Sequence, residues 1–99
     1  MIDEYFAKYG LNFSIEDCRS EEDSDWNYYT NEDFSITVDE DIHYHDTNEY
    51  RATVWVNVND YIEKEFIQGE EEELIKFITT DKLKLLEERT LDQIKKDFN

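Results

Sequence analysis

The residues whose type and spacing come closest to supporting chemistry are two histidines, His43 and His45. On an extended strand, side chains two residues apart point to the same face. Asp41 lies two residues before them, and Glu49 lies across a possible turn. Imidazole and carboxylate groups are ligands that zinc accepts. A two-histidine pair without a third ligand at a diagnostic spacing is better explained by a solvent-facing hairpin, so we expect no metal ion and no cofactor.

No other arrangement in the sequence suits catalysis. A calcium loop that begins at Asp39 would need glycine at its sixth position and glutamate at its twelfth, but these residues are Tyr44 and Tyr50. Cys18 is the single cysteine, so no intrachain disulfide can form, and we expect a spectator thiol. The sequence contains no P-loop, no G-x-S-x-G, no H-E-x-x-H and no C-x-x-C. We therefore expect no catalytic residues and no enzyme.

The dominant feature is an acidic and aromatic stretch over residues 16–49. It holds thirteen carboxylates and one cation, Arg19, in a chain of 99 residues whose formal net charge is −17. Residues 1–50 carry fifteen acids and two cations, whereas residues 51–99 carry twelve acids and eight cations. A chain cannot bury that much like charge, and disordered acidic tails are usually poor in aromatics. We therefore expect a folded acidic surface that meets a positively charged partner.

The charge also restricts the class of partner. The phosphates of nucleic acids and of anionic membranes would be repelled, so we expect no direct binding to either. Basic proteins, such as nucleases, other nucleic-acid-binding proteins or cationic toxins, are favoured. The N-terminus lacks the basic and apolar regions of a signal peptide, and no apolar run approaches the roughly 18 residues of a membrane span. We expect a cytoplasmic protein.

The first third of the chain predicts one helix followed by short strands. Apolar residues at helical spacing over residues 2–9 predict a helix, and Gly10 follows as its C-cap. Alternation predicts a strand at 11–15 and another at 26–30. Residues 17–25 between them predict an exposed acidic loop.

The centre of the chain, residues 34–58, predicts an antiparallel hairpin with one buried face. Phe34, Ile36 and Val38 alternate on that face in the first strand. In the second strand the buried positions begin at Tyr50 and recur at every second residue to Val58. The intervening Asp-Thr-Asn-Glu segment has turn chemistry.

Beyond Asn59 the apolar period becomes helical. Residues 61–67 predict a short helix closed by Gly69, and further helices are expected to begin at residue 70, near Thr80 and at Thr90. The predicted fold is α+β: an N-terminal helix, a three- to four-stranded antiparallel sheet, and C-terminal helices packed on one face, in a single domain over residues 1–99.

The binding hypothesis depends on how the carboxylates are spaced. At alternate strand positions they stand about 6.5 to 7 Å apart, which is comparable with the spacing of phosphates along a nucleic-acid strand. Asp39 and Asp41 follow this pattern directly. Tyr28 and Tyr29 are adjacent, so one of them points outward as an anchor, and we assign this role to Tyr29. The predicted partner-binding residues are Glu21, Glu22, Asp23, Asp25, Tyr29, Glu32, Asp33, Asp39, Glu40, Asp41, Asp46 and Glu49.

A second acidic run, Glu70–Glu73, has two interpretations that the sequence leaves open. Acids in the first turn of a helix stabilise it through the helix dipole. The same run is also a dense charge cluster of the sign expected for the binding surface.

The size, charge, aromatic-acidic middle and α-β-α order resemble the small acidic DNA-mimic inhibitors of phages and mobile elements, particularly anti-CRISPR proteins. Several of these inhibitors block the site at which an RNA-guided nuclease reads the protospacer-adjacent motif through arginines. The resemblance implies a DNA mimic that occupies the basic groove of a nuclease, most specifically of an RNA-guided effector, inside a bacterial host cell.

An alternative is an immunity or antitoxin protein that neutralises a basic nuclease toxin. The same acidic face, tyrosine anchors and cytoplasmic location would serve it, and the genes adjacent to the coding gene would distinguish the two. A third class is a regulatory or structural module, in which the surface acids would be replaceable without loss of activity.

Overall fold

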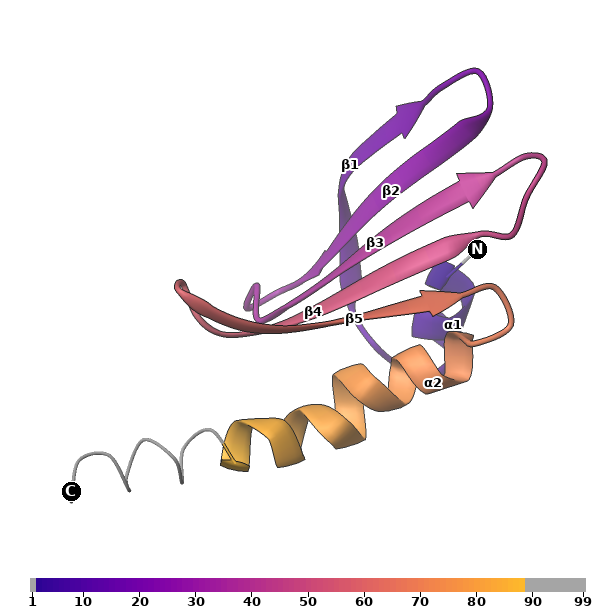
Figure 1. The fold of residues 1–99 in the computed structure, drawn as a ribbon. Coiled ribbons are helices and arrows are strands. Elements are labelled where there is room, and N and C mark those ends of the chain that lie inside the picture. Colours follow the sequence, from indigo (N-terminus) through magenta and orange to yellow (C-terminus); the bar gives the residue numbers. More distant parts are fainter. Residues whose placement is uncertain (1, 89–99) are drawn as a thin grey trace.

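A computed structural model describes residues 2–88 as a five-stranded antiparallel sheet with helices on one of its faces (Figure 1). The strands follow one another in the order β1-β2-β3-β4-β5, each hydrogen-bonded to the next, so the sheet is a meander. Their bounds are β1 Phe13–Ser20, β2 Ser24–Asn31, β3 Ile36–His43, β4 Glu49–Asn57 and β5 Asp60–Ile67. The predicted α+β class is confirmed, but the sheet has five strands rather than three or four.

The prediction of an acidic loop over residues 17–25 is wrong, because most of these residues belong to strands. β1 continues to Ser20 and β2 begins at Ser24, so that only three residues form the turn. The Glu21 amide closes this turn by donating to the Ser24 carbonyl at 2.7 Å. The side chains near this turn are mostly polar, because the turn end of the hairpin lies outside the buried core, so the strands show no apolar alternation there.

The short helix predicted at residues 61–67 is also wrong, because this segment is strand β5. Ile62 and Phe66 are four residues apart, a spacing that satisfies both a helix and a strand. In the sheet they lie opposite Val54 and Tyr50 of β4, which places all four on the buried face. Pairing with the free edge of β4 therefore overrides the local helical pattern.

The predicted hairpin of β3 and β4 is confirmed, with two corrections at its ends. Phe34 is not part of the buried face: it lies in the β2–β3 turn with a φ of 58° and is largely exposed. The register of β4 and β5 shifts between Trp55 and Asn57, so the alternation that starts at Tyr50 ends there. Val58 is consequently 88% exposed in the β4–β5 turn.

The N-terminal helix is confirmed as α1, Ile2–Lys8, and it ends where the glycine was predicted to end it. Gly10 has a φ of 69°, a left-handed conformation that glycine adopts without steric cost. The Leu11 amide then donates to the Phe6 carbonyl at 2.8 Å, which satisfies one of the last carbonyls of the helix.

The C-terminal helices form one continuous helical segment as far as Glu88. α2 spans Glu71–Lys76, a π-helical stretch η1 follows over Phe77–Asp81, and helical structure continues directly after it. A helix start near Thr80 is therefore wrong. The Thr79 hydroxyl donates to the Ile75 carbonyl at 2.7 Å within this segment. The helix predicted from Thr90 lies outside the described residues.

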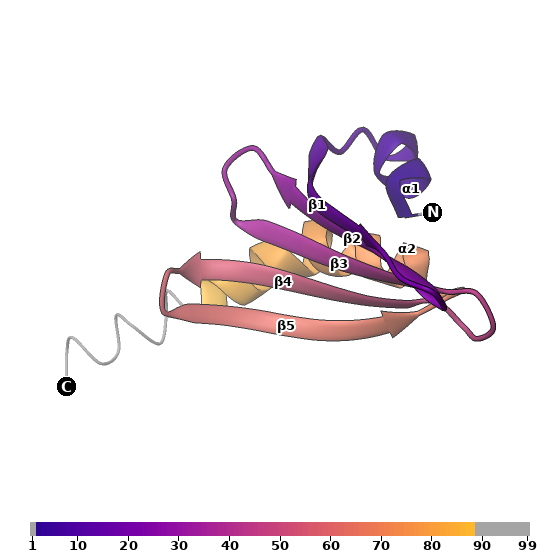
Figure 2. The same ribbon diagram turned by 90° about the horizontal axis from the view of Figure 1, so that it is seen from above.

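The core lies between the helices and one face of the sheet, and within residues 2–88 the other face carries no helix. Figure 2 shows α2 behind the strands. Aromatic contacts join the two layers: the Phe6 and Tyr29 rings lie 5.4 Å apart, and the Phe66 and Phe77 rings 6.0 Å apart. The buried apolar residues are Ile2, Phe6, Tyr29, Ile36, Val38, Tyr50, Ala52, Val54, Phe66, Leu74, Ile75, Phe77 and Ile78.

Candidate functional site

The sheet face opposite the helices, called here the open face, is built from cross-strand rows of side chains. Directly paired residues of an antiparallel sheet lie on the same face, so the strand register identifies each row. One row contains Asp17, Tyr28, Asp39, Arg51 and Glu65, in strand order. The next contains Arg19, Trp26, Asp41, Glu49 and Ile67.

The open face is strongly acidic because its two arginines are already paired. Arg19 lies 3.5 Å from Asp17, and Arg51 lies 3.6 Å from Glu63 and 3.2 Å from Glu65. Hydrogen bonding to Glu65 and the nearby carboxylates raise the pKa of Arg51, which keeps it charged. Asp39 and Asp41, the carboxylates that β3 contributes to the open face, therefore remain available to an external cation.

Asp39 lies at the centre of this face and is half-buried. Burial raises the pKa of its carboxyl, Arg51 partly offsets this effect, and the charges of Asp41 and Glu63 raise the pKa further. Asp39 and Asp41 are alternate residues of β3, so their side chains are about 6.5 to 7 Å apart along the strand. The two carboxylates therefore share one surface at the alternate-residue spacing of a strand.

Aromatic rings flank these carboxylates on the open face. Trp26 and Tyr28 stack with their ring centroids 5.9 Å apart and their planes at 8°, and the Arg19 guanidinium lies 5.6 Å from the Trp26 ring. Farther along the sheet, the Trp55 and Tyr61 rings lie 4.9 Å apart. Stacked rings hold each other in place, so little conformational entropy would be lost when a partner covers them.

A shallow hollow of about 340 Å³ lies on the open face beside Trp26. Asp39 and Asp41 of β3 line it together with Glu49 of β4. Glu65 of β5, Glu70 and the paired cation Arg51 complete the charged lining. A basic side chain that entered this hollow would meet carboxylates from three strands and an indole ring.

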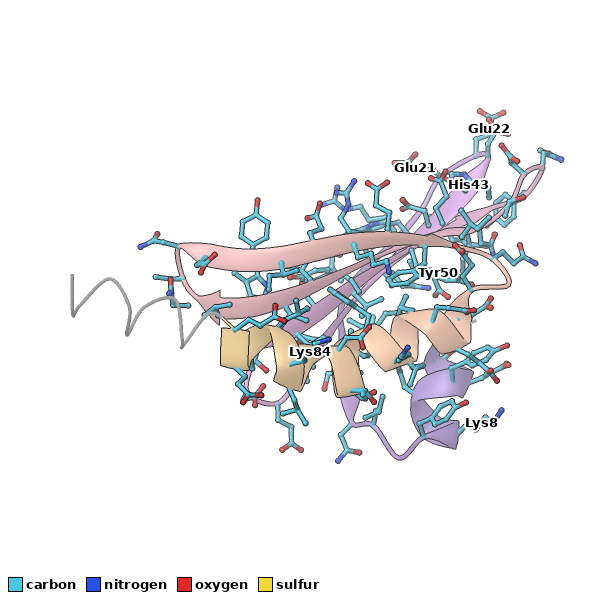
Figure 3. The ribbon with its side chains drawn as sticks, turned by 60° about the horizontal axis from the view of Figure 1, so that its bottom comes forward. Lys8, Glu21, Glu22, His43, Tyr50 and Lys84 are labelled. Atoms are coloured by element: carbon cyan, nitrogen blue, oxygen red, sulfur yellow. The ribbon has the colours of Figure 1, made fainter. Side chains whose placement is uncertain are left out.

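The predicted partner-binding residues that lie in turns are divided between the two ends of the sheet. Glu21, Glu22 and Asp23 form the β1–β2 turn, beside the β3–β4 turn that contains Asp46, and the Tyr44 amide donates to the Asp23 carbonyl at 3.1 Å. Figure 3 shows Glu21, Glu22 and His43 at this end of the sheet, whereas Lys8 and Lys84 lie on the helix side. Glu32 and Asp33 lie at the opposite end, in the β2–β3 turn.

Asp25 on β2 and Asp33 in the β2–β3 turn are held by hydrogen bonds within the protein. Asp25 lies opposite Ile42 and Ser20, on the helix side of the sheet, and accepts a bond of 2.7 Å from the Ser20 hydroxyl. Hydrogen bonds from Tyr44 and Ser20 lower its pKa. The hydroxyl and amide of Ser35 likewise lower the pKa of Asp33, which belongs to a stable turn.

Two predicted partner-binding residues, Tyr29 and Glu40, are corrected by the structure because both are buried. Tyr29 is 1% exposed and packs in the core, so the outward member of the tyrosine pair is Tyr28. Glu40 is 0% exposed and accepts hydrogen bonds from the Ile2 amide, the Asn27 side chain and the Tyr29 hydroxyl at 2.6, 3.0 and 3.2 Å. Neither side chain can contact a partner in this fold.

Several residues of the open face were not predicted from the sequence, for two reasons. Asp17 was assigned to a loop, and Glu63 and Glu65 were assigned to a helix, so their common face with Asp39 was not recognised. A signal existed in β5, where Tyr61, Glu63 and Glu65 alternate with the residues of the buried face. Tyr28 is the outward tyrosine of its pair, whereas the sequence-based prediction assigned that role to Tyr29.

The Glu70–Glu73 run has a structural role at Glu71. Glu71 is buried, receives a hydrogen bond of 3.1 Å from the Tyr50 hydroxyl, and accepts from the Gly69 amide. Burial alone would raise the pKa of Glu71, but these hydrogen bonds outweigh it and lower the pKa. This carboxylate connects α2 to β4 and is not available to a partner.

Comparison of the chain with protein-family models, with curated protein sequences and with solved structures gives no match. Among the described residues 2–88, no helix has the length and apolar character needed to cross a membrane. The geometry and charge of the open face are therefore the features from which a function can be inferred.

Proposed function

We propose that this protein is a DNA-mimic inhibitor that binds the basic nucleic-acid-binding groove of a nuclease. The more specific proposal is an anti-CRISPR activity, in which the open face covers the arginines that read DNA or its protospacer-adjacent motif in an RNA-guided effector. The protein acts by binding, without catalysis, in the cytoplasm of the bacterial host.

One observation carries the proposal: carboxylates and aromatic rings share a sheet face that none of the helices described in residues 2–88 covers. Asp39 and Asp41 on β3 stand beside Trp26 and Tyr28 on β2. A face needed only for solubility would not require a stacked aromatic pair among its charges. Carboxylates attract a basic groove, and buried aromatic contacts are the usual energetic centre of an interface.

The positions of the lysines and arginines also support the open face as the side that meets a basic partner. Of the seven lysines and arginines in residues 2–88, only Arg19 and Arg51 lie on the open face, and each is paired with carboxylates. Lys64 projects to the helix side, where its ammonium lies 5.3 Å from the Phe66 ring. A basic partner that approaches the open face therefore meets no unpaired cation of the described residues.

The test is a cleavage assay with purified RNA-guided nucleases of several types, each loaded with guide RNA before the protein is added. Inhibition of DNA cleavage by one effector, together with loss of binding when target DNA is bound first, is the expected result. Binding that persists alongside DNA would contradict mimicry. A matched control uses the protein with Asp39→Lys and Asp41→Lys, which should no longer inhibit.

The immunity or antitoxin alternative predicts a different outcome of the same experiment. Such a protein would inhibit a basic nuclease toxin and leave every RNA-guided effector active. If the protein inhibits neither a nuclease toxin nor an RNA-guided effector, the proposed function as a whole is overturned.

A further inference from the structure

Three side chains at the turn end of the open face have the composition of a metal site. Asp41, His43 and Glu49 each place one ligand atom so that these atoms lie within 4.8 Å of one another. It is the one such group of histidine and carboxylate side chains that residues 2–88 contain. The histidine nitrogen distinguishes it from purely acidic runs of the sequence such as Glu70–Glu73.

We propose that Asp41, His43 and Glu49 bind a divalent transition-metal ion, with zinc as the best-fitting ion. Three protein ligands with a fourth position open to water is an arrangement that zinc commonly adopts. An imidazole ligand favours zinc over calcium or magnesium, which prefer sites made of oxygen ligands alone.

The positions of the three ligands are fixed by the sheet itself. Asp41 and His43 are alternate residues of β3, and Asp41 lies directly opposite Glu49 on β4. The side chain of Asn48 accepts a hydrogen bond of 3.0 Å from the His43 amide, which anchors the end of β3 to the turn. Ligands on two paired strands are more precisely placed than ligands on a loop.

Electrostatics favours a cation at this position. Like charges directly opposite each other in a sheet are destabilising, and Asp41 faces Glu49 in this way. His43 Nε2 lies 3.6 Å from Glu49 Oε2, an ion pair that needs a protonated ring and neutralises one carboxylate. A divalent ion would neutralise both carboxylates and bind the ring in its neutral form.

His45, the other half of the histidine pair in the sequence, provides the matched control. It lies in the exposed β3–β4 turn, outside the group formed by His43 and the two carboxylates. Asp46 lies in the same turn and is exposed, so it controls for the removal of a carboxylate.

The experiment is a calorimetric titration of the full chain, without any partner, with zinc chloride at neutral pH in a buffer that does not bind metals. We expect one equivalent to bind, and His43→Ala and Asp41→Asn each to weaken the affinity by at least roughly tenfold. His45→Ala and Asp46→Asn should leave it unchanged, and calcium chloride should not bind with comparable affinity.

Nuclear magnetic resonance of the unmodified protein keeps the test independent of variant folding. Zinc should shift the ring signals of His43 and leave those of His45 in place. Absence of zinc binding, equal shifts of both rings, or unchanged affinity in His43→Ala would each overturn the proposal. Because the titration and the spectra contain no partner protein, their outcomes do not depend on whether the proposed inhibitory function is correct.

Discussion

The backbone amide of Ile2 donates a hydrogen bond of 2.6 Å to the carboxylate of Glu40, whose side chain is completely buried. Glu40 lies on β3 at the centre of the sheet, and Ile2 begins α1, so the contact joins residues 38 positions apart. The second oxygen of Glu40 accepts from Asn27 and Tyr29. One acid of the acidic stretch is therefore a structural anchor for the N-terminal helix.

Replacing Glu40 with glutamine should destabilise the fold. The amide group has one acceptor oxygen, so its NH₂ would face either the Ile2 amide or the Asn27 side chain, both of which are donors. Leaving a buried donor unsatisfied costs about 1–3 kcal/mol, or roughly 5 to 15 °C in the melting temperature of a domain of this size. Thermal denaturation followed by circular dichroism measures this loss. Asp46→Asn, in an exposed turn, is the control and should have little effect, whereas a Glu40→Gln variant as stable as the wild type would contradict the anchor role.

How far the sequence predicts this fold depends on which signal each segment carries. The hairpin of β3 and β4 was predictable because its apolar residues alternate, and α1 because its apolar residues recur at helical spacing. Strand β5 was not, because Ile62 and Phe66 fit both periods and the deciding factor is the edge of β4, a tertiary contact. The apolar pattern of a segment indicates which residues are buried, but pairing with a neighbouring strand determines whether the segment is a helix or a strand.

The positions of the acidic residues on the sheet were predictable from the sequence only in part. Asp39 and Asp41, which the charge density of the sequence singled out, lie on the open face, and their role in binding stays a prediction. Adjacent residues on a strand face opposite ways, so assigning Glu40 and Tyr29 required the strand register, which one sequence does not supply. Nothing in the composition of the acidic stretch distinguishes the buried Glu40 from the exposed acids around it.

Reversing two charges of the open face, with Asp39→Lys and Asp41→Lys, should weaken partner binding by about 2 kcal/mol or more, close to 30-fold. Each lysine would face the partner's cations in place of a carboxylate. The control reverses the same number of charges at Glu87 and Glu88, which are exposed on the C-terminal helical segment. Calorimetric titration with the inhibited nuclease compares the two variants, and an equal effect of both would mean that net charge alone matters.

Tyr28→Ala should weaken binding by about 2 kcal/mol while leaving the fold intact, because the ring lies on the open face and stacks on Trp26. Tyr9→Ala removes an equally large ring that is exposed just after α1, and it should leave the affinity unchanged. Surface plasmon resonance would detect the difference as a faster dissociation rate. An unchanged rate for Tyr28→Ala would remove this tyrosine from the interface.

Asp39→Asn should raise stability at neutral pH although it weakens binding. Burial raises the pKa of the Asp39 carboxyl above its unfolded value, so the folded protein favours the protonated form. The stabilising contribution of this group is complete below the unfolded pKa and is lost as the pH rises through the raised folded value. At pH 7 the neutral asparagine avoids that loss, and we expect a gain on the order of 0.5 kcal/mol, about 2 to 4 °C in melting temperature. Melting curves at pH 7 and near pH 3 should show the gain at pH 7 only, and a gain of equal size at both would point to a cause other than ionisation.

Association with the partner should be fast at low salt and should slow steeply as salt is added. The unpaired carboxylates of the open face act at a distance before contact, and their reach is the Debye length, about 10 Å at 0.1 M salt and about 3 Å at 1 M. Raising sodium chloride from about 0.05 to 0.5 M should therefore reduce the association rate constant by roughly tenfold or more, whereas the dissociation rate, which depends on aromatic contacts such as Tyr28, should change far less. Stopped-flow fluorescence of Trp26 and Trp55, which both lie on the open face, follows the reaction without a label.

In the variant with Asp39→Lys and Asp41→Lys, the association rate should depend less steeply on salt. An association rate that does not change with salt in the wild-type protein would mean that the acidic face does not steer the encounter.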